Sequence, residues 1–253
     1  MKRLVLRAVT LSVFAFGLTA FAQQFTHSAN LAGGSVAPLP PTPSILPAQT
    51  SDKPTADEIV ERMIEKNKER LTALERYESD RTYRVEYKGT GGEHHAELRV
   101  HAEYVGPNQK KFTVISESGP KFLCEKVLRK LVESEQEAST AAGRNQITLS
   151  PETYTMELTG EETVAGERAW VLHVAPRVEN KFSYRGDVWI SQDDYGILRV
   201  VGSPAKSPSW WIDRASFDSR YVRRGNAWLP ESNVATSHVR IGGQATLTID
   251  YGT

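Results

Sequence analysis

One stretch of the chain, from Lys181 to Ile212, restricts the fold more than any other part of the sequence. Its apolar side chains recur at every second residue and so share one face of a strand: Phe182, Tyr184, Val188 and Ile190. Residues 191–194 read Ser-Gln-Asp-Asp and predict a turn, because Ser and Asp side chains hydrogen-bond their own backbone. Residues 197–201 alternate again and predict the returning strand. The centre of the chain is therefore expected to be a β-hairpin.

The same alternation continues on both sides of this hairpin. It predicts strands at 83–87, 96–104, 112–116, 154–158, 169–174, around 217–221, 234–241 and 244–251. Two amphipathic helices are also predicted, one from Thr55 to about Tyr77, opened by a Thr55–Glu58 capping box, and one from Pro120 to about Glu137. About ten strands, with helices that do not alternate with them, favour the α+β class. We expect a strongly curved antiparallel β half-barrel in meander order, with both helices packed on the concave face.

The first residues have the features of a secretory signal peptide. Lys2, Arg3 and Arg7 precede an apolar run from Ala8 to Phe21, and a small-x-small site predicts cleavage after Ala22. An uncleaved membrane anchor is the alternative, but the run is shorter than the roughly 20 residues that a spanning helix needs. We therefore expect export to the periplasm.

Three segments follow from this prediction. Residues 1–22 are the signal peptide, 23–53 a Pro-rich disordered linker, and 54–253 the folded domain. Loss of the first segment leaves 28 basic against 31 acidic residues, which argues against a nucleic-acid partner. No second apolar run approaches the spanning length, so no transmembrane segment is expected in the mature chain, and we expect a monomer.

No residue pattern predicts a metal or a cofactor. His95 and His101 share a strand face but lie roughly 20 Å apart at about 3.3 Å per residue. Cys124 is the single cysteine and lies among apolar residues of the second helix, which favours a buried, unreactive thiol. Sequences typical of zinc, calcium or phosphate sites are absent.

Two pairs of adjacent carboxylates are candidate catalytic groups. Asp193-Asp194 lies in the predicted turn, and Glu161-Glu162 lies beside a strand, so solvated surface roles account for both. No GxSxG sequence marks a serine nucleophile. We expect no catalytic residue, and a hydrolase that uses Asp193 or Glu161 is the third hypothesis.

The tryptophans allow two interpretations. Trp210 and Trp211 follow a Pro-containing corner, and the other three lie on or beside strands: Trp170, Trp189 and Trp228. They could fill the core, since an aromatic side chain buries roughly 150–250 Å². They could equally form the wall of an apolar cavity beneath the helices.

These residues together resemble a known superfamily. The ADEIVERMIEKN helix, the GDVWISQDDYGILRVVG hairpin and the closing ATLTIDY strand are similar to those of periplasmic lipoprotein carriers of the LolA/LolB type and the related sigma-factor regulatory sensor domains. The resemblance covers roughly residues 54–252. It implies an open half-barrel whose helices form a lid over an apolar cavity, and members that bind acyl chains of lipoproteins or other lipids.

The resulting hypothesis is a non-enzymatic periplasmic carrier for acyl chains of a lipoprotein or phospholipid. The residues expected to line its lipid cavity are Tyr83, Tyr87, Leu98, Val100, Phe112, Trp170 and Leu172. Ser118-Gly119-Pro120 is the expected hinge of the second helix. The alternative is an envelope sensor or protein-interaction module with the same fold, a packed core and no lipid cargo.

Overall fold

The structure is a computed structural model, and it describes residues 53–73, 76–105, 109–138, 149–207, 212–240 and 242–252. The helical segments are α2 (Ala56–Ala73), α3 (Lys121–Leu123), η2 (Cys124–Leu128) and α4 (Arg129–Ala138). The strands are β1 (Arg76–Gly89), β2 (Gly92–Val105), β3 (Gln109–Ser118), β4 (Tyr154–Val164), β5 (Glu167–Pro176), β6 (Tyr184–Ser191), β7 (Ile197–Pro204), β8 (Ile212–Arg224), β9 (Ala227–Val239) and β10 (Gly243–Asp250).

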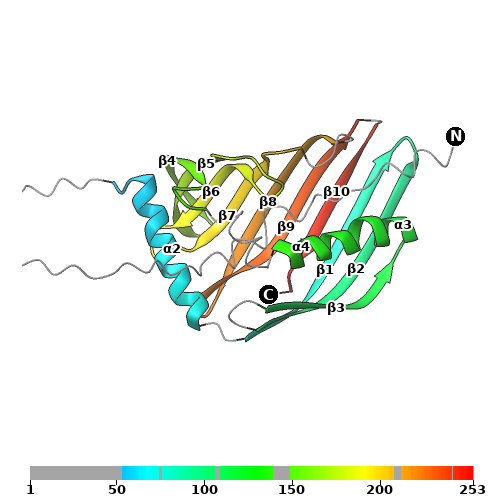
Figure 1. Cartoon of the computed structure of the whole chain (residues 1–253), viewed down its shortest axis with the longest axis horizontal. Coiled ribbons are helices and arrows are strands. Elements are labelled where there is room, and N and C mark those ends of the chain that lie inside the picture. Colours follow the sequence, from blue (N-terminus) through cyan, green and yellow to red (C-terminus); the bar gives the residue numbers. More distant parts are fainter. Residues whose placement is uncertain are drawn as a thin grey trace, which may run out of the picture.

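All ten strands belong to one open antiparallel sheet (Figure 1). Their order is β3-β2-β1-β10-β9-β8-β7-β6-β5-β4, so β3 and β4 form the two edges and the sheet does not close on itself. The α+β class and the ten antiparallel strands predicted from the sequence are confirmed, and an open sheet of this size is consistent with a curved half-barrel.

The strand order differs from a simple meander at one step. In a meander β4 would pair with β3, whereas here these two strands lie at opposite edges. The first strand pairs instead with the last, in a register that runs from Thr82 opposite Asp250 to Gly89 opposite Gly243. Alternation along a strand specifies which side chains share a face, but it does not specify which strand lies alongside.

The first helix begins as predicted and ends earlier. The backbone N–H of Thr55 donates to Glu58 Oε2 at 2.8 Å, and the N–H of Glu58 donates to Thr55 Oγ1 at 3.3 Å, which completes the capping box. However, α2 ends at Ala73, and Tyr77 pairs with Tyr104 as part of the β1–β2 ladder. The predicted helix end at Tyr77 is therefore wrong, because strand pairing already holds that part of the chain.

The second helical region runs continuously from Lys121 to Ala138 and contains one π-helical turn, η2. Cys124 is buried there, as predicted. The residue before the region, Gly119, has φ +107°, and a Cβ at this position would lie 2.6 Å from the carbonyl oxygen of His95. Only glycine fits this turn without strain.

Both helical regions pack on the sheet through one continuous apolar core. The first helix contributes Ile59, Val60 and Met63, and the second region contributes Leu123, Val127, Leu128 and Leu131. Figure 1 shows α2 beside β4 to β7 and the α3–α4 region running across β1 and β2. Over the part of the chain that the structure describes, neither helical region is long and apolar enough to cross a membrane.

Several predictions fall on residues outside the described ranges. They concern the signal peptide at 1–22, all but the last residue of the linker at 23–53, and the pair Trp210 and Trp211.

Candidate functional site

The candidate site is the face of the sheet on which the helices pack, called here the inner face. The seven residues predicted to line a cavity all belong to the apolar core or pack against it. Five are buried within it, namely Tyr83, Leu98, Val100, Trp170 and Leu172, and Tyr87 and Phe112 are partly buried against it. Among the buried five, the largest exposed fraction is the 9% of Trp170. These side chains are therefore packed against neighbours in this structure.

The strand order separates the seven residues into two groups. Five lie on β1, β2 and β3, close to the α3–α4 region. The other two, Trp170 and Leu172, lie on β5 at the far side of the sheet. There the ring of Trp170 lies 5.2 Å from that of Tyr195, whose hydroxyl accepts a hydrogen bond from Arg62 of α2. Each helical region thus covers its own part of the inner face.

A buried ion pair ties α4 to β1. Arg81 Nη1 contacts Glu135 Oε1, and the two side chains are only 2% and 1% exposed. The hydroxyl of Tyr83 donates to the other oxygen of Glu135 at 2.6 Å. A carboxylate buried in this way needs both contacts, because an unpaired buried charge costs several kcal/mol.

Aromatic rings enclose the arginine of this pair. The guanidinium carbon of Arg81 lies 4.9 Å from the ring centre of Tyr251 and 5.5 Å from that of Phe112. Burial alone would lower the pKa of Arg81, but the Glu135 carboxylate holds it above its usual value. Burial and the same carboxylate raise the pKa of Tyr83. At neutral pH the arginine is charged and the tyrosine is a neutral hydrogen-bond donor.

A second cation, Lys110, lies beside the pair. Its side chain is 7% exposed, and its Nζ is 4.0 Å from Glu135 Oε1. Burial lowers the pKa of Lys110 to about 7, and the positive charge of Arg81 also lowers it, while Glu135 opposes the change. One carboxylate therefore faces two basic groups.

Lys110 should make the stability of the protein depend on pH. In the unfolded chain the lysine keeps its proton up to about pH 10.5, whereas in the folded protein it releases it near pH 7. Between these values the unfolded state binds more protons, so the free energy of unfolding should rise with pH by up to about 1.4 kcal/mol per pH unit. We expect Lys110→Met to remove this rise, as measured by urea unfolding between pH 6.5 and 9.5. The exposed neighbour Lys111, changed to Met, is the control, and an unaltered pH slope in Lys110→Met would contradict the prediction.

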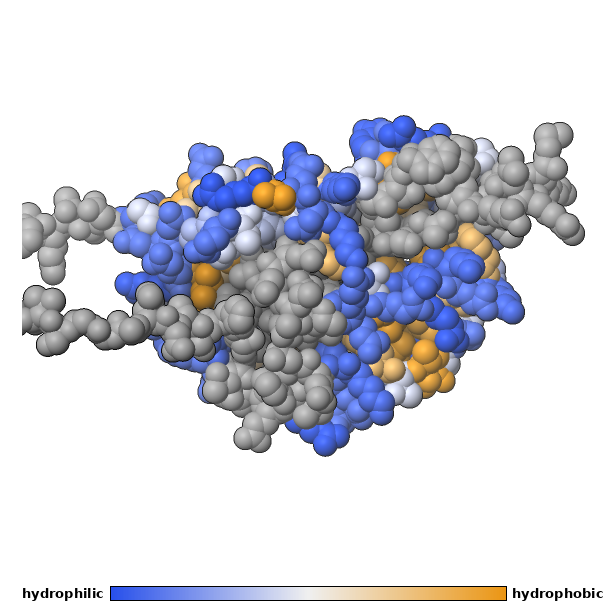
Figure 2. All heavy atoms as spheres, in the orientation of Figure 1, coloured by the Kyte–Doolittle hydropathy of each residue, from blue (hydrophilic) through white to orange (hydrophobic). Residues whose placement is uncertain are grey.

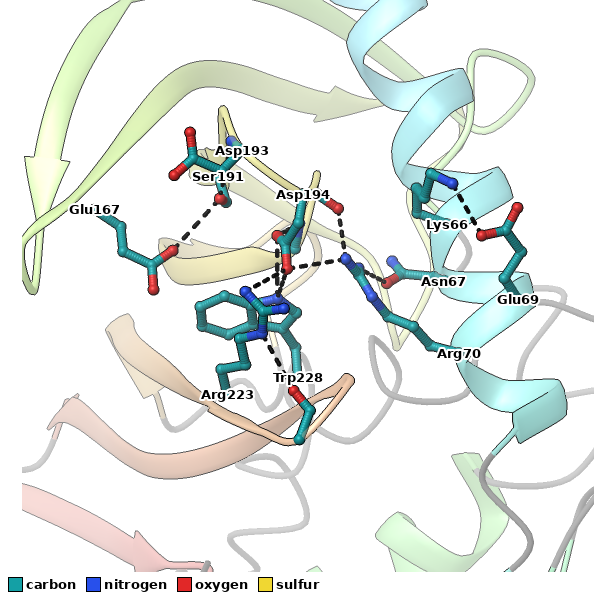
Figure 3. Close-up of polar contacts among 12 residues, drawn as sticks. Lys66, Asn67, Glu69, Arg70, Glu167, Ser191, Asp193, Asp194, Arg223 and Trp228 are labelled. Carbon is teal, nitrogen blue, oxygen red and sulfur yellow. Dashed lines mark hydrogen bonds and ion pairs between the residues drawn. The ribbon is translucent and has the colours of Figure 1, made fainter.

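A different polar contact ties α2 to the sheet (Figure 3). Arg70 Nη2 lies 3.0 Å from Asp194 Oδ2, in the turn between β6 and β7. The indole N–H of Trp228 donates to the same carboxylate at 2.9 Å, and Arg223 lies 3.5 Å from it. Burial would raise the pKa of Asp194, but these donors and the N–H of Gly196 lower it below its usual value. The carboxylate is ionised at neutral pH and joins α2, β8 and β9.

The paired carboxylates of the sequence analysis have hydrogen-bond and ion-pair partners in the structure. Asp194 makes the contacts just described, and Ser191 Oγ accepts a hydrogen bond from the N–H of Asp193 at 3.3 Å within the turn. Glu161 is exposed and pairs with Lys53 at 2.8 Å and with Gln192 at 3.0 Å. The predicted turn at 191–194 is confirmed.

The histidines within the described ranges lie on the exposed side of the sheet or near its turns. His101 Nδ1 is 2.8 Å from Asp80 Oδ1, and this hydrogen bond raises the pKa of the imidazole. His173 makes a similar contact with Asp187 at 2.8 Å. In the described parts of the chain, no three histidine, cysteine or acidic side chains come together as ligands of one metal ion.

The residues that join the two helical regions to the sheet were not predicted from the sequence. They are the Arg81–Glu135 pair and the Arg70–Asp194 pair, called here the polar ties. Arg81 and Glu135 are 54 residues apart, and Arg70 and Asp194 are 124 residues apart. The sequence contains a local signal for Arg81, because this residue lies in an alternating row on one strand face: Tyr77, Ser79, Arg81 and Tyr83. The buried arginine in that row interrupts an apolar pattern and could have marked an unusual position.

Comparison with known proteins gives matches in structure alone. No protein-family model matches the chain, and no curated protein matches it. A DUF1329 family protein from Desulfovibrio piger is similar with a TM-score of 0.39 and 12% identity, over 78% of this chain and 92% of that one. A putative outer membrane lipoprotein-sorting protein domain from Vibrio parahaemolyticus has a TM-score of 0.38 and 14% identity, over 77% and 94% of the two chains.

A LolA superfamily protein from Nitrosomonas europaea is similar with a TM-score of 0.31 and 10% identity, over 78% of this chain and 92% of that one. The superfamily that the sequence resembles is thus among the matching structures. With TM-scores below 0.5 and identities of 10 to 14%, these similarities do not assign a function to this chain.

Proposed function

We propose that this protein binds the acyl chain of a lipoprotein or phospholipid between the inner face of its sheet and its two helical regions. The proposal rests on the way in which the helical regions cover the inner face of the sheet. A ten-stranded sheet with an apolar inner face is covered, among the described residues, by two separate helical regions, each held by its own polar tie. A ligand chain could enter where one helix moves while the other stays in place.

Apolar burial would supply the affinity. Each Å² of apolar surface removed from water contributes about 25 cal/mol, before the cost of ordering the ligand. Because Leu98, Val100 and Leu172 are fully buried in this structure, the space must come from movement of a helix. The α3–α4 region would turn about Ser118-Gly119-Pro120, and α2 would be released when Arg70 leaves Asp194.

In this proposal the protein is a carrier in the periplasm and acts without catalysis. The concave side of a curved sheet suits this role, because it surrounds a flexible chain on more than one side. The expected signal peptide at residues 1–22 and the sequence resemblance to lipoprotein carriers support the location and the class of cargo.

A protein-interaction module is the second candidate function, and two observations favour it. The predicted cavity residues are packed with no exposure at several positions, as expected for a core that holds no cargo. Apolar surface also gathers at the β3 edge, where Val114 and Ile115 are 41% and 47% exposed (Figure 2). An exposed edge strand can pair with a strand of a partner protein.

Photo-crosslinking would test the proposal. The purified mature protein is incubated with a fatty acid that carries a diazirine on its chain, irradiated, and mapped by peptide mass spectrometry. We expect adducts on inner-face residues such as Leu98 and Leu172. Adducts confined to the exposed Val114, Ile115 or Val178 would show adsorption to the surface instead. A protein that also carries no lipid when purified from its native envelope would favour the interaction module.

A further inference from the structure

The charges beneath α4 do not balance. Within the described ranges, the buried cluster there contains two basic side chains, Arg81 and Lys110, and one carboxylate, Glu135. Arg81 contacts one carboxylate oxygen and the Tyr83 hydroxyl donates to the other, so each oxygen of Glu135 already has a partner. When Lys110 carries its proton, the cluster holds one positive charge that no carboxylate of the cluster neutralises. Burial of such a charge is costly unless an anion joins it.

The ammonium group of Lys110 also has unused donors. Its distance of 4.0 Å to Glu135 is too long for a hydrogen bond, and no hydrogen bond from Lys110 to another described residue is present. The strand register places Lys110 beside Tyr104, and Tyr104 beside Tyr77. The hydroxyl of Tyr77 is buried and has no hydrogen-bond partner among the described residues. A cation and a hydroxyl on one row of the sheet thus both lack an acceptor within the described part of the chain.

This polar cluster directly adjoins the apolar part of the inner face. Val100 lies opposite Arg81 in the register of β1 and β2, and Leu98 lies opposite Tyr83. Both apolar side chains are fully buried beneath the α3–α4 region. An acyl chain placed along Leu98 and Val100 would therefore end at the basic groups.

We propose that Lys110, together with Arg81 and with Tyr77 two strands away on the same row, binds the anionic head group of the acyl ligand. This inference rests on the proposed function and specifies its ligand as an anionic amphiphile. A carboxylate or a phosphate would accept hydrogen bonds from the ammonium group and the tyrosine hydroxyl, and it would neutralise the excess positive charge. Arg81 would keep its contact with Glu135 and add attraction at longer range.

Three ligands with the same twelve-carbon chain test this head-group site: dodecanoate, dodecyl phosphate and dodecanol. Their affinities are measured by displacement of an apolar fluorescent probe from the mature protein. A charge-assisted hydrogen bond in a buried site should make wild type prefer at least one anionic ligand to dodecanol by about tenfold or more. The preferred anion then distinguishes a carboxylate head group from a phosphate.

Lys110→Met keeps the length of the side chain and removes its charge, so it should reduce the preference to about twofold or less. It should fold, because it removes a buried charge, and a thermal unfolding curve checks this. Lys111→Met is the matched control and should keep the wild-type preference, since Lys111 is exposed. Equal binding of all three ligands by wild type, or an unchanged preference in Lys110→Met, would overturn the head-group assignment. Failure of every ligand to bind would overturn the proposed function itself.

Discussion

Replacing Glu135 with alanine should lower the free energy of unfolding by about 3–5 kcal/mol, which is the usual cost of removing one partner from a buried ion pair. The variant leaves the guanidinium of Arg81 buried without its carboxylate, and the hydroxyl of Tyr83 without an acceptor. Urea unfolding of wild type and variant measures the difference. Because the pair joins α4 to β1, the α3–α4 region should also lose protection in hydrogen exchange.

A surface glutamate of the same helix provides the control. Glu133 is exposed and pairs with Lys130 three residues away, so Glu133→Ala should change stability by less than about 1 kcal/mol. The double variant Arg81→Met with Glu135→Leu removes both charges and should recover most of the lost stability at pH 8, where Lys110 has released its proton. Equal effects of Glu135→Ala and Glu133→Ala would show that the ion pair does not hold α4.

The sheet could be predicted from the sequence because its signal is local. Along β10, the alternation of Ala245, Leu247 and Ile249 with polar residues defines a strand wetted on one face, and these three residues are buried as expected. The turn at 191–194 and the capping box at Thr55 were also predictable, since each depends on side chains within a few residues of one another.

The features that could not be predicted depend on contacts between distant parts of the chain. The sequence near β1 does not indicate that this strand pairs with β10. Its two neighbours, β2 and β10, show the same alternation of apolar and polar residues, so alternation does not identify the partner. The early start of β1 was missed because Ser79 and Arg81 occupy inner-face positions where apolar residues are expected. Arg81 is tolerated there because Glu135, far along the chain, supplies the opposite charge, and the Ser79 hydroxyl accepts a hydrogen bond from Arg81 Nε at 3.3 Å.

For the candidate site, the sequence predicts which residues lie on the inner face of the sheet but not how they are arranged there. Alternation correctly placed Tyr83, Leu98 and Val100 on the inner face, but alternation alone says nothing about how tightly the helices pack on them. The polar end of that face depends on Lys110, which sequence analysis did not single out. A lysine near a turn is usually solvated, and the 7% exposure of the Lys110 side chain results from the fold around it.

Replacing Leu98 with asparagine should destabilise the protein by about 3–6 kcal/mol. Leu98 is fully buried on β2, so the substitution loses about 2–3 kcal/mol of apolar burial. It also leaves a buried amide without an assigned partner, which costs a further 1–3 kcal/mol or so. Val114→Asn is the control on the neighbouring strand and should change stability by about 0.5 kcal/mol or less, because Val114 is 41% exposed.

The same pair of variants also bears on the choice between a carrier and a packed interaction module. Urea unfolding measures the stability of each variant, and probe displacement measures the binding of dodecanoate. If Leu98→Asn unfolds at the wild-type midpoint, Leu98 does not pack against the α3–α4 region in solution, and the space beneath that region is open to water. Loss of dodecanoate binding in such a stable variant would place the acyl chain against Leu98. If the variant is destabilised as expected, the helices pack on the sheet in the free protein, and a ligand must displace them to enter.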